Sequence, residues 1–202
     1  MNDPVIHVID DDEAMRQSLS FLLDAAGMTA RTYESAARFL NDVADLAPGC
    51  IVTDVRMPEI SGLDLVHRLN DREIRLPIII ITGHGDIPLA VEAMKAGVAD
   101  FLEKPFDDET LLGAIRAAMN RPTAPEDAEK SRLVGLFAGL SPRERDVLGG
   151  VVDGKPNKVI AHELGISPRT VEVYRANVMT KTGAGSLSEL VRMALHAGVG
   201  LD

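Results

Sequence analysis

Five polar residues that could carry out phosphoryl transfer are spread along the first half of this 202-residue sequence: Asp10, Asp11, Asp54, Thr82 and Lys104. Three carboxylates brought together repel one another unless a proton or a cation lies among them. Oxygen ligands suit Mg²⁺, which binds one or two carboxylates together with water and phosphate oxygens. The Lys104 amine and the Thr82 hydroxyl would stabilise the negative charge that spreads over a phosphoryl group during transfer.

Asp54 is the candidate nucleophile of this set, and its product would be an aspartyl phosphate. The predicted magnesium ligands are Asp10, Asp11, Asp54 and the main-chain carbonyl of Arg56. Each residue alone has a plainer interpretation, since an acid at a strand end usually caps a helix or lies in a turn, and a single lysine usually lies at the surface. Their combination on successive strand ends is what indicates a site.

The elements that must position these side chains are short β-rich runs alternating with helical patterns. The runs are residues 5–9, 29–33, 50–53, 78–81 and 99–102. After the first run, residues 14–26 place Met15, Leu19 and Leu22 at helical spacing, and Gly27 supplies a stop. The alternation predicts a (βα)5 α/β domain, doubly wound and flavodoxin-like, with helices on both faces of a parallel sheet. Ligands bind such sheets at the carboxyl ends of the strands, where the five polar residues would meet.

The second half lacks strand patterns. Residues 121–132, RPTAPEDAEKSR, contain two prolines and no apolar periodicity, so we expect a linker over 121–135 between a first domain at 1–120 and a second at 136–202. Helical patterns then cover residues 142–152, 157–164, 168–182 and 187–197. The second domain is therefore predicted to be an all-α, four-helix domain.

The charge balance also differs between the halves. Residues 1–120 hold 21 acids and 10 bases, whereas residues 121–202 hold 10 acids and 11 bases, in agreement with the net charge of −10. Five bases and two acids lie within residues 155–181, so any contact with DNA phosphates is expected there. The apolar runs are too short for a membrane span and the amino terminus lacks a secretory signal, so we expect a cytoplasmic location.

Residues 157–176, NKVIAHELGISPRTVEVYRA, have the spacing of a helix-turn-helix, with Ala161 at the close helix crossing, Gly165 in the turn and Val171 as apolar anchor. Ser167 would cap a recognition helix at 168–182 whose first turns enter the major groove. The predicted contacts to bases are Arg169, Glu172, Val173 and Ala176. The remaining predicted DNA contacts, mostly to phosphates, are Lys158, Ser167, Thr170, Arg175 and Lys181.

Four motifs resemble the receiver domain of two-component response regulators over residues 3–120: IDDDE at 9–13, TDVRMPEISGLDL at 53–65, ITGHGD at 81–86 and FLEKPF at 101–106. This resemblance implies that a sensor histidine kinase phosphorylates Asp54 and that Mg²⁺ is bound by the ligands named above. It also implies a cis peptide bond before Pro105. It further implies a switch in which Thr82 moves toward the phosphate and Phe101 turns inward.

The sequence LSPRERDVL at residues 140–148, followed by the helix pair, resembles the LuxR-type four-helix DNA-binding domain over residues 136–202. Glu172 departs from the basic residue expected on the outward face, although a carboxylate can accept a hydrogen bond from cytosine. The order of the domains and the wording of the motifs are most similar to response regulators that work with an oxygen-sensing kinase in nitrogen-fixation control.

The two resemblances together imply a transcription factor and not an enzyme, with only slow autodephosphorylation, and with promoter DNA and RNA polymerase as partners. Phosphorylation would alter the surface formed by residues 88–97 and 99–102 and so favour a homodimer that binds paired half-sites. Arg56 and His84 stand two residues beyond Asp54 and Thr82, where we expect their side chains to tune the lifetime of the phosphate.

Two other interpretations fit parts of the sequence. An aspartate-nucleophile phosphatase would use similar chemistry, but such enzymes usually place an acid two residues after the nucleophile and carry a substrate cap, for which no insertion is present. The helical half could instead bind a protein. Salt separates these alternatives, because DNA binding weakens steeply as the salt concentration rises.

Overall fold

The computed structural model describes residues 4–43, 46–83, 87–120 and 126–199. Contacts divide the chain into two compact units, one made of Met1–His84 and Ala96–Arg121 and the other of Gly85–Lys95 and Pro122–Asp202. The domain limits expected from the sequence, 1–120 and 136–202 with a linker at 121–135, stay a prediction. No helix in the described ranges is long and apolar enough to cross a membrane.

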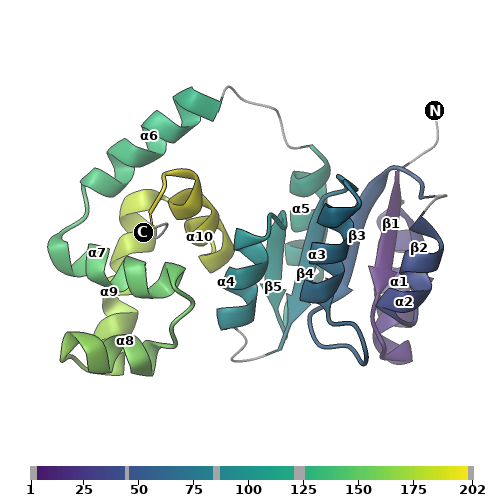
Figure 1. The fold of residues 1–202 in the computed structure, drawn as a ribbon, viewed down its shortest axis with the longest axis horizontal. Helices are drawn as coiled ribbons and strands as arrows, with labels where there is room; N and C mark the ends of the chain where they lie inside the picture. The colour runs from purple at the N-terminus through teal and green to yellow at the C-terminus, as the bar shows by residue number, and fades with distance from the viewer. Residues whose placement is uncertain (1–3, 44–45, 84–86, 121–125, 200–202) are drawn as a thin grey trace. The chain divides into compact units, whose positions relative to one another are not determined.

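The first unit is built on a parallel sheet with the strand order β2-β1-β3-β4-β5 (Figure 1). The strands are β1 (Val5–Ile9), β2 (Thr29–Tyr33), β3 (Gly49–Asp54), β4 (Ile78–Thr82) and β5 (Asp100–Glu103). All five predicted strands are confirmed to within one residue at each end. The ladder runs one residue further than the apolar pattern because backbone pairing continues through Asp54 and Thr82, opposite Ile81 and Glu103.

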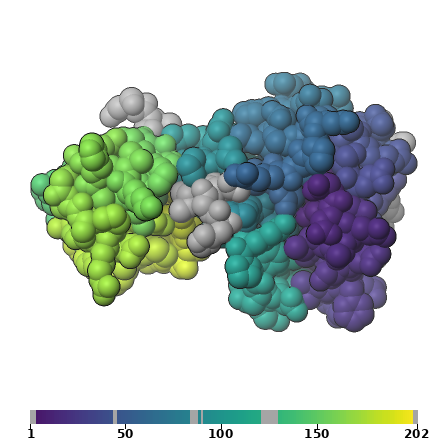
Figure 2. Space-filling view, turned by 90° about the horizontal axis from the view of Figure 1, so that it is seen from below, coloured from purple at the N-terminus to yellow at the C-terminus, as the bar shows by residue number. Residues whose placement is uncertain are grey.

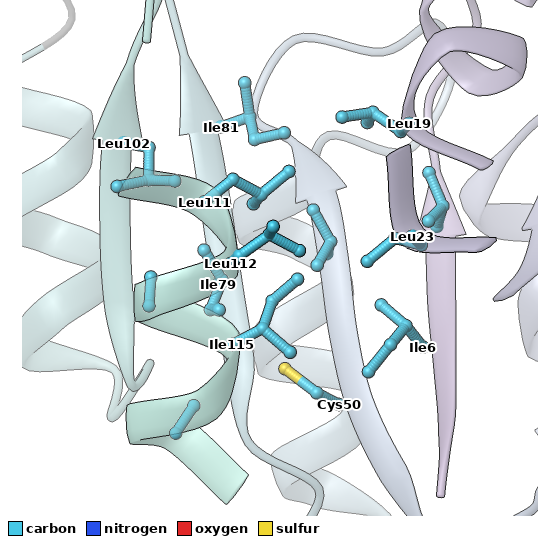
Figure 3. Close-up of a cluster of buried hydrophobic side chains, with 14 of the residues drawn as sticks. Ile6, Leu19, Leu23, Cys50, Ile79, Ile81, Leu102, Leu111, Leu112 and Ile115 are labelled. Carbon is cyan, nitrogen blue, oxygen red and sulfur yellow. The ribbon is translucent and has the colours of Figure 1, made fainter. Parts of the chain in front are cut away.

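Helices cover both faces of this sheet, as predicted for a flavodoxin-like fold. On one face, α1 (Glu13–Ala25) and α5 (Asp108–Met119) bury Leu23 and Ile115 against Ile6 and other strand residues (Figure 3). Side chains alternate along a strand, so His7 of β1 points to the opposite face. There its ring centroid lies 5.8 Å from that of Phe39 on α2 (Ala36–Asn41). The remaining helix of this unit, α3 (Gly62–Asp71), follows β3 in the chain.

The second unit is helical. It contains α4 (Ile87–Lys95), α6 (Glu126–Ala138), α7 (Pro142–Val152), α8 (Asn157–Leu164), α9 (Pro168–Thr182) and α10 (Leu187–His196). The four helices predicted for residues 142–197 are confirmed, and the last ends one residue earlier than expected. Their shared core includes Leu148, Val178 and Leu190.

Residues 126–132, which lie in the predicted linker, form the first half of α6, a helix that the sequence patterns did not predict. The segment EDAEKSR has no apolar periodicity, but most of its residues favour the helical backbone by propensity alone. Tertiary packing comes from the end of the same helix, where Leu133 and Phe137 lie one turn apart and are 1% and 5% exposed. Residues 121–125 lie outside the described ranges.

Candidate functional site

The carboxyl ends of β1 and β3 lie side by side at the point where the strand order reverses direction, which is where open α/β sheets bind ligands. Asp10 follows β1 directly, and Asp54 is the last residue of β3. Asp54 Oδ1 accepts a hydrogen bond of 2.7 Å from the Arg56 N–H. This bond fixes the orientation of a carboxylate whose side chain is 12% exposed.

Lys104, just beyond β5, reaches this point from two strands away. Its amine donates to Asp54 Oδ2 and lies 3.7 Å from Asp10 Oδ2. Burial alone would lower the pKa of Lys104, but its hydrogen bond to Asp54 and the surrounding acid charges raise that pKa above its ordinary value. The amine therefore stays protonated. The Lys104 N–H also bonds to the Thr82 carbonyl at 2.8 Å, and the peptide bond to Pro105 is cis, as the resemblance implied.

Asp10 is only 2% exposed, and one of its oxygens, Oδ2, is buried without a hydrogen-bond partner in the described structure. Oδ1 accepts from the Asp12 N–H at 2.8 Å. Burial raises the pKa of the Asp10 carboxyl, and the nearby charges of Asp54 and Asp11 add to this effect, while the Asp12 N–H and the Lys104 charge oppose it. A buried carboxylate oxygen in this situation fits a position beside a cation.

The donor set fits a hard ion that brings most of its own ligands. Among the described residues, no group of three acid, histidine or cysteine side chains is gathered closely enough to hold a metal ion alone. Magnesium usually keeps several waters and takes only one or two carboxylates from the protein. The carboxylates of Asp10 and Asp54 fit that requirement, because the Lys104 amine contacts both of them, and the Asp11 charge also acts on Asp10.

Thr82 and Phe101 are both buried, at 2% and 7% exposure. The Thr82 hydroxyl donates to the Gly83 carbonyl at 3.3 Å, and no hydrogen bond joins it to Asp54 in this structure. The expected approach of this hydroxyl to a phosphate therefore stays a prediction, as does the turning of Phe101. His84, expected to tune phosphate lifetime, lies outside the described residues.

Three further residues build the site, and none of them was predicted. Gly62 begins α3, and a Cβ there would stand 2.3 Å from the Asp54 carbonyl oxygen, so only glycine lets α3 approach the end of β3. The Arg16 guanidinium bonds to the carbonyls of Asp10 and Asp11, at 2.8 and 3.0 Å. Asp12 caps α1 by accepting from the backbone N–H of residues 14 and 15. Only the Asp12 cap had a sequence signal, an acid directly before a helical pattern.

The helix pair α8–α9 has the predicted local chemistry. Gly165 ends α8 in the left-handed conformation, at φ 66°. Ser167 then caps α9, because its hydroxyl oxygen accepts the Thr170 N–H at 3.1 Å, and Pro168 occupies the first turn. Ala161 and Val171 are 2% and 0% exposed, which confirms the close crossing and the anchor.

The predicted base contacts lie on one exposed side of α9. They are Arg169, Glu172, Val173 and Ala176, whose side chains are all exposed. Their spacing of three and four residues places them along one stripe of the helix. Lys158 and Ser167 are also exposed, whereas Thr170 is half-buried. In the space-filling view, the light-green to yellow-green residues of α8 and α9 form an open surface of the second unit (Figure 2).

Two of the predicted phosphate contacts are bonded inside the unit. The Arg175 guanidinium donates to Asn157 Oδ1 at 2.8 Å, which ties α9 to the start of α8. The Lys181 amine donates to Glu144 Oε2 at 2.8 Å, which ties the end of α9 to α7. The bond from Lys181 and the Ser141 N–H hold the pKa of Glu144 at about 2. Arg175 and Lys181 therefore position α9 through bonds within the unit, apart from any contact with DNA phosphates.

Comparisons with known proteins agree with this geometry. Residues 6–116 match the family model "Response regulator receiver domain", and residues 138–194 match "Bacterial regulatory proteins, luxR family". The chain is 59% identical to the transcriptional regulatory protein FixJ of Azorhizobium caulinodans, over 96% of this chain and 93% of that protein. It is 50% identical to FixJ of Rhizobium meliloti, over 99% of both.

A crystal structure of full-length FixJ from B. japonicum is 52% identical in sequence, with a TM-score of 0.58 over 98% of both chains. The two family models match the two halves of the chain, and the FixJ relatives are similar over nearly all of it. The chain belongs to the two-component response regulators, with a receiver domain and a LuxR-family DNA-binding domain that serve transcription regulation.

Proposed function

We propose that a sensor histidine kinase phosphorylates this regulator on Asp54, and that the phosphorylated chain dimerises through its receiver domain and binds promoter DNA through α9. The observation that supports this most directly is the Asp54 carboxylate, bonded to a protonated Lys104 amine that also lies 3.7 Å from a buried Asp10 oxygen, for which the described residues provide no hydrogen bond. In the transfer step, the bond between phosphorus and the kinase histidine breaks while a bond forms between phosphorus and an Asp54 oxygen. The Lys104 amine keeps its proton and offsets the charge of the arriving group.

Asp10, Asp11, Asp54 and the main-chain carbonyl of Arg56 are the proposed holders of Mg²⁺. The bound ion would neutralise charge on the phosphoryl oxygens during transfer. Arg16 positions this set, because its guanidinium holds the carbonyls of Asp10 and Asp11. Asp54 is held in turn by the Arg56 N–H, which donates to one carboxylate oxygen, while the Lys104 amine donates to the other.

The proposed output begins with the Thr82 hydroxyl. Among the described residues it bonds to the Gly83 carbonyl, at 3.3 Å, so a new phosphate at Asp54 would offer it a stronger acceptor. The resulting movement, with Phe101, would change the receiver surface and favour a dimer. A dimer compensates for a DNA-binding half that carries 11 bases against 10 acids, since few phosphate contacts give weak binding to a single half-site.

RNA polymerase, a cytoplasmic location, and nitrogen-fixation genes as targets are part of the same proposal. They are supported by the similarity to FixJ proteins over nearly the whole chain.

A single experiment tests the switch. The purified chain is incubated with Mg²⁺ and acetyl phosphate, the modified residue is located by mass spectrometry, and the oligomeric state and the DNA selected from a random pool are compared before and after. We expect phosphate on Asp54, a shift to dimer and enrichment of paired half-sites. The exposed Asp71, at the end of α3, provides the control. Asp71→Asn should be modified as the wild type is, whereas equal modification of Asp54→Asn would overturn the assignment.

A further inference from the structure

The exposed stripe of α9 has an unusual composition for a surface that approaches DNA, because its middle holds a valine and an acid. Val173 is 54% exposed, and Glu172 precedes it on the same open side. We propose that these two residues determine the base preference: Val173 packs on the methyl group of a thymine, and Glu172 accepts from the amino group of a neighbouring cytosine. This inference rests on the proposed entry of α9 into the major groove.

Val173 can recognise only one group in that groove. The buried valines of α9, Val171 and Val178, are 0% and 1% exposed and hold the opposite side of the helix in the core. More than half of the Val173 surface is therefore available to a partner outside its own unit. In the major groove, the apolar group is the C5-methyl of thymine, which A·T and T·A pairs present and G·C pairs do not. A valine in a helix also has one strongly preferred rotamer, so little conformational entropy is lost when it makes this contact.

Glu172 limits which base can lie beside the thymine. No hydrogen bond or ion pair joins its carboxylate to another described residue, in contrast to Arg175 and Lys181. A carboxylate is repelled by phosphates and by the acceptors of guanine, so it needs a donor on a base edge. Adenine presents a donor beside the N7 acceptor, whereas cytosine presents its N4 amino group as a donor alone. Cytosine is therefore the preferred partner.

The test uses the phosphorylated full-length chain and an operator selected from a random pool. Each thymine of a half-site is replaced in turn by deoxyuridine, which lacks only the methyl group, and the dissociation constant is measured by fluorescence anisotropy. We expect one thymine per half-site at which the replacement weakens binding about fourfold, as for the loss of one buried methyl. Val173→Ala should bind the thymine and deoxyuridine operators equally.

The matched control for this variant is Val159→Ala, since Val159 is also an exposed valine, 42% exposed, but lies on α8. It should keep the full discrimination between thymine and deoxyuridine. For the second contact, Glu172→Gln should change the preferred base beside that thymine from cytosine to adenine, because a glutamine pairs with both adenine groups.

The outcomes separate the two levels of inference. If no DNA is enriched from the pool, the proposed function fails. If DNA is enriched but wild-type binding is unchanged by deoxyuridine at every position, or Glu172→Gln keeps its preference for cytosine, the proposed base recognition is wrong while DNA binding stands. Circular dichroism of both variants checks the fold, and the deoxyuridine series on the wild type needs no variant at all.

Discussion

The receiver domain assembles its functional groups from distant strands, whereas the DNA-binding domain displays its groups along one helix. Lys104 and Asp54 are 50 residues apart and meet in a partly buried contact. Arg169, Glu172 and Val173 lie within two turns of α9 and are all exposed. The first arrangement depends on the path of the backbone, and the second depends on which side chains remain free of internal bonds. Substitutions should therefore act differently in the two domains.

The largest expected effect is at a backbone contact of the receiver domain. In Gly62→Ala the new methyl group would meet the Asp54 carbonyl, so α3 or the end of β3 must move. We expect the free energy of unfolding to fall by about 1–3 kcal/mol, as for other overpacked sites. Phosphorylation by acetyl phosphate should also slow, because the Asp54 carboxylate moves with its backbone. Urea unfolding and the rate of phosphate incorporation measure the two effects.

Gly113→Ala is the matched control for that variant. Gly113 lies inside α5, and a Cβ there would have nothing within 4 Å. An alanine should stabilise the helix by about 0.5–1 kcal/mol and leave phosphorylation unchanged. Equal stability of the two variants would contradict the role given to Gly62.

The next largest effect should be a difference between the two domains in how acid changes their free energy of unfolding. Burial lowers the pKa of His7, although the bond to the Ala47 carbonyl opposes this. The unfolded chain takes up a proton near pH 6.5 while the folded domain resists it, so the free energy of unfolding falls as the pH drops below about 6.5. Glu144, with its pKa lowered to about 2, stabilises the fold fully above about pH 4.5 and loses this effect only below that. Between about pH 6.5 and 4.5 we expect the receiver domain alone to weaken.

The two tyrosines of the chain, with no tryptophan present, make this measurable by fluorescence. The Tyr33 hydroxyl lies 3.4 Å from His7 Nδ1, and Tyr174 lies on α9, so Tyr174→Phe leaves only the receiver signal. Asp10 acts in the opposite direction, since a raised pKa makes its burial less costly in acid. Adding His7→Gln, which keeps hydrogen-bonding groups but does not titrate, should remove the acid weakening. If the receiver domain of this variant still loses stability in acid, a group other than His7 causes the loss.

The part of the receiver site that the sequence predicts is the part determined by topology. The carboxyl ends of parallel strands share one edge, so Asp10, Asp54 and Lys104 could be placed together from their strand positions. Gly62 could not, because its role depends on how closely the next helix approaches β3. The first half of α6 was missed for another reason: it forms by propensity, and its packing residues lie beyond the segment that lacked a pattern.

In the DNA-binding domain, helical spacing predicts which side of α9 is exposed but not which charges are free. Arg175 and Lys181 had the type and position of phosphate contacts. Their partners, Asn157 and Glu144, lie 18 and 37 residues away on other helices. Such pairing is set by helix crossing and side-chain reach, which no local pattern encodes.

A smaller effect should come from the paired glycines of α7. A Cβ at Gly150 would stand 2.8 Å from a carbon of Ile160 on α8, whereas one at Gly149 would meet nothing within 4 Å. Because a side chain and not backbone must shift, we expect Gly150→Ala to cost about 1 kcal/mol and to weaken DNA binding by moving α8. Gly149→Ala should be neutral or slightly stabilising. Thermal unfolding and operator affinity of the two variants should be measured side by side. Equal stability and equal affinity would contradict a close contact between α7 and α8 at Gly150.

The smallest expected effect concerns the salt dependence of DNA binding, which should differ between two lysine variants. The logarithm of DNA affinity falls with the logarithm of salt concentration by about 0.9 for each phosphate contact. Lys158 is exposed and makes no hydrogen bond or ion pair with another described residue, so Lys158→Met should reduce the slope by about that amount. The Lys181 amine is bonded to Glu144, so Lys181→Met should weaken binding at every salt concentration through a misplaced α9, with the slope unchanged. If Lys181→Met lowers the slope as Lys158→Met does, Lys181 leaves Glu144 for a phosphate in the complex. The internal bond would then be a resting position of a DNA contact, and Lys181 of α9 would differ less from the exposed Lys158 of α8 than the structure without DNA indicates.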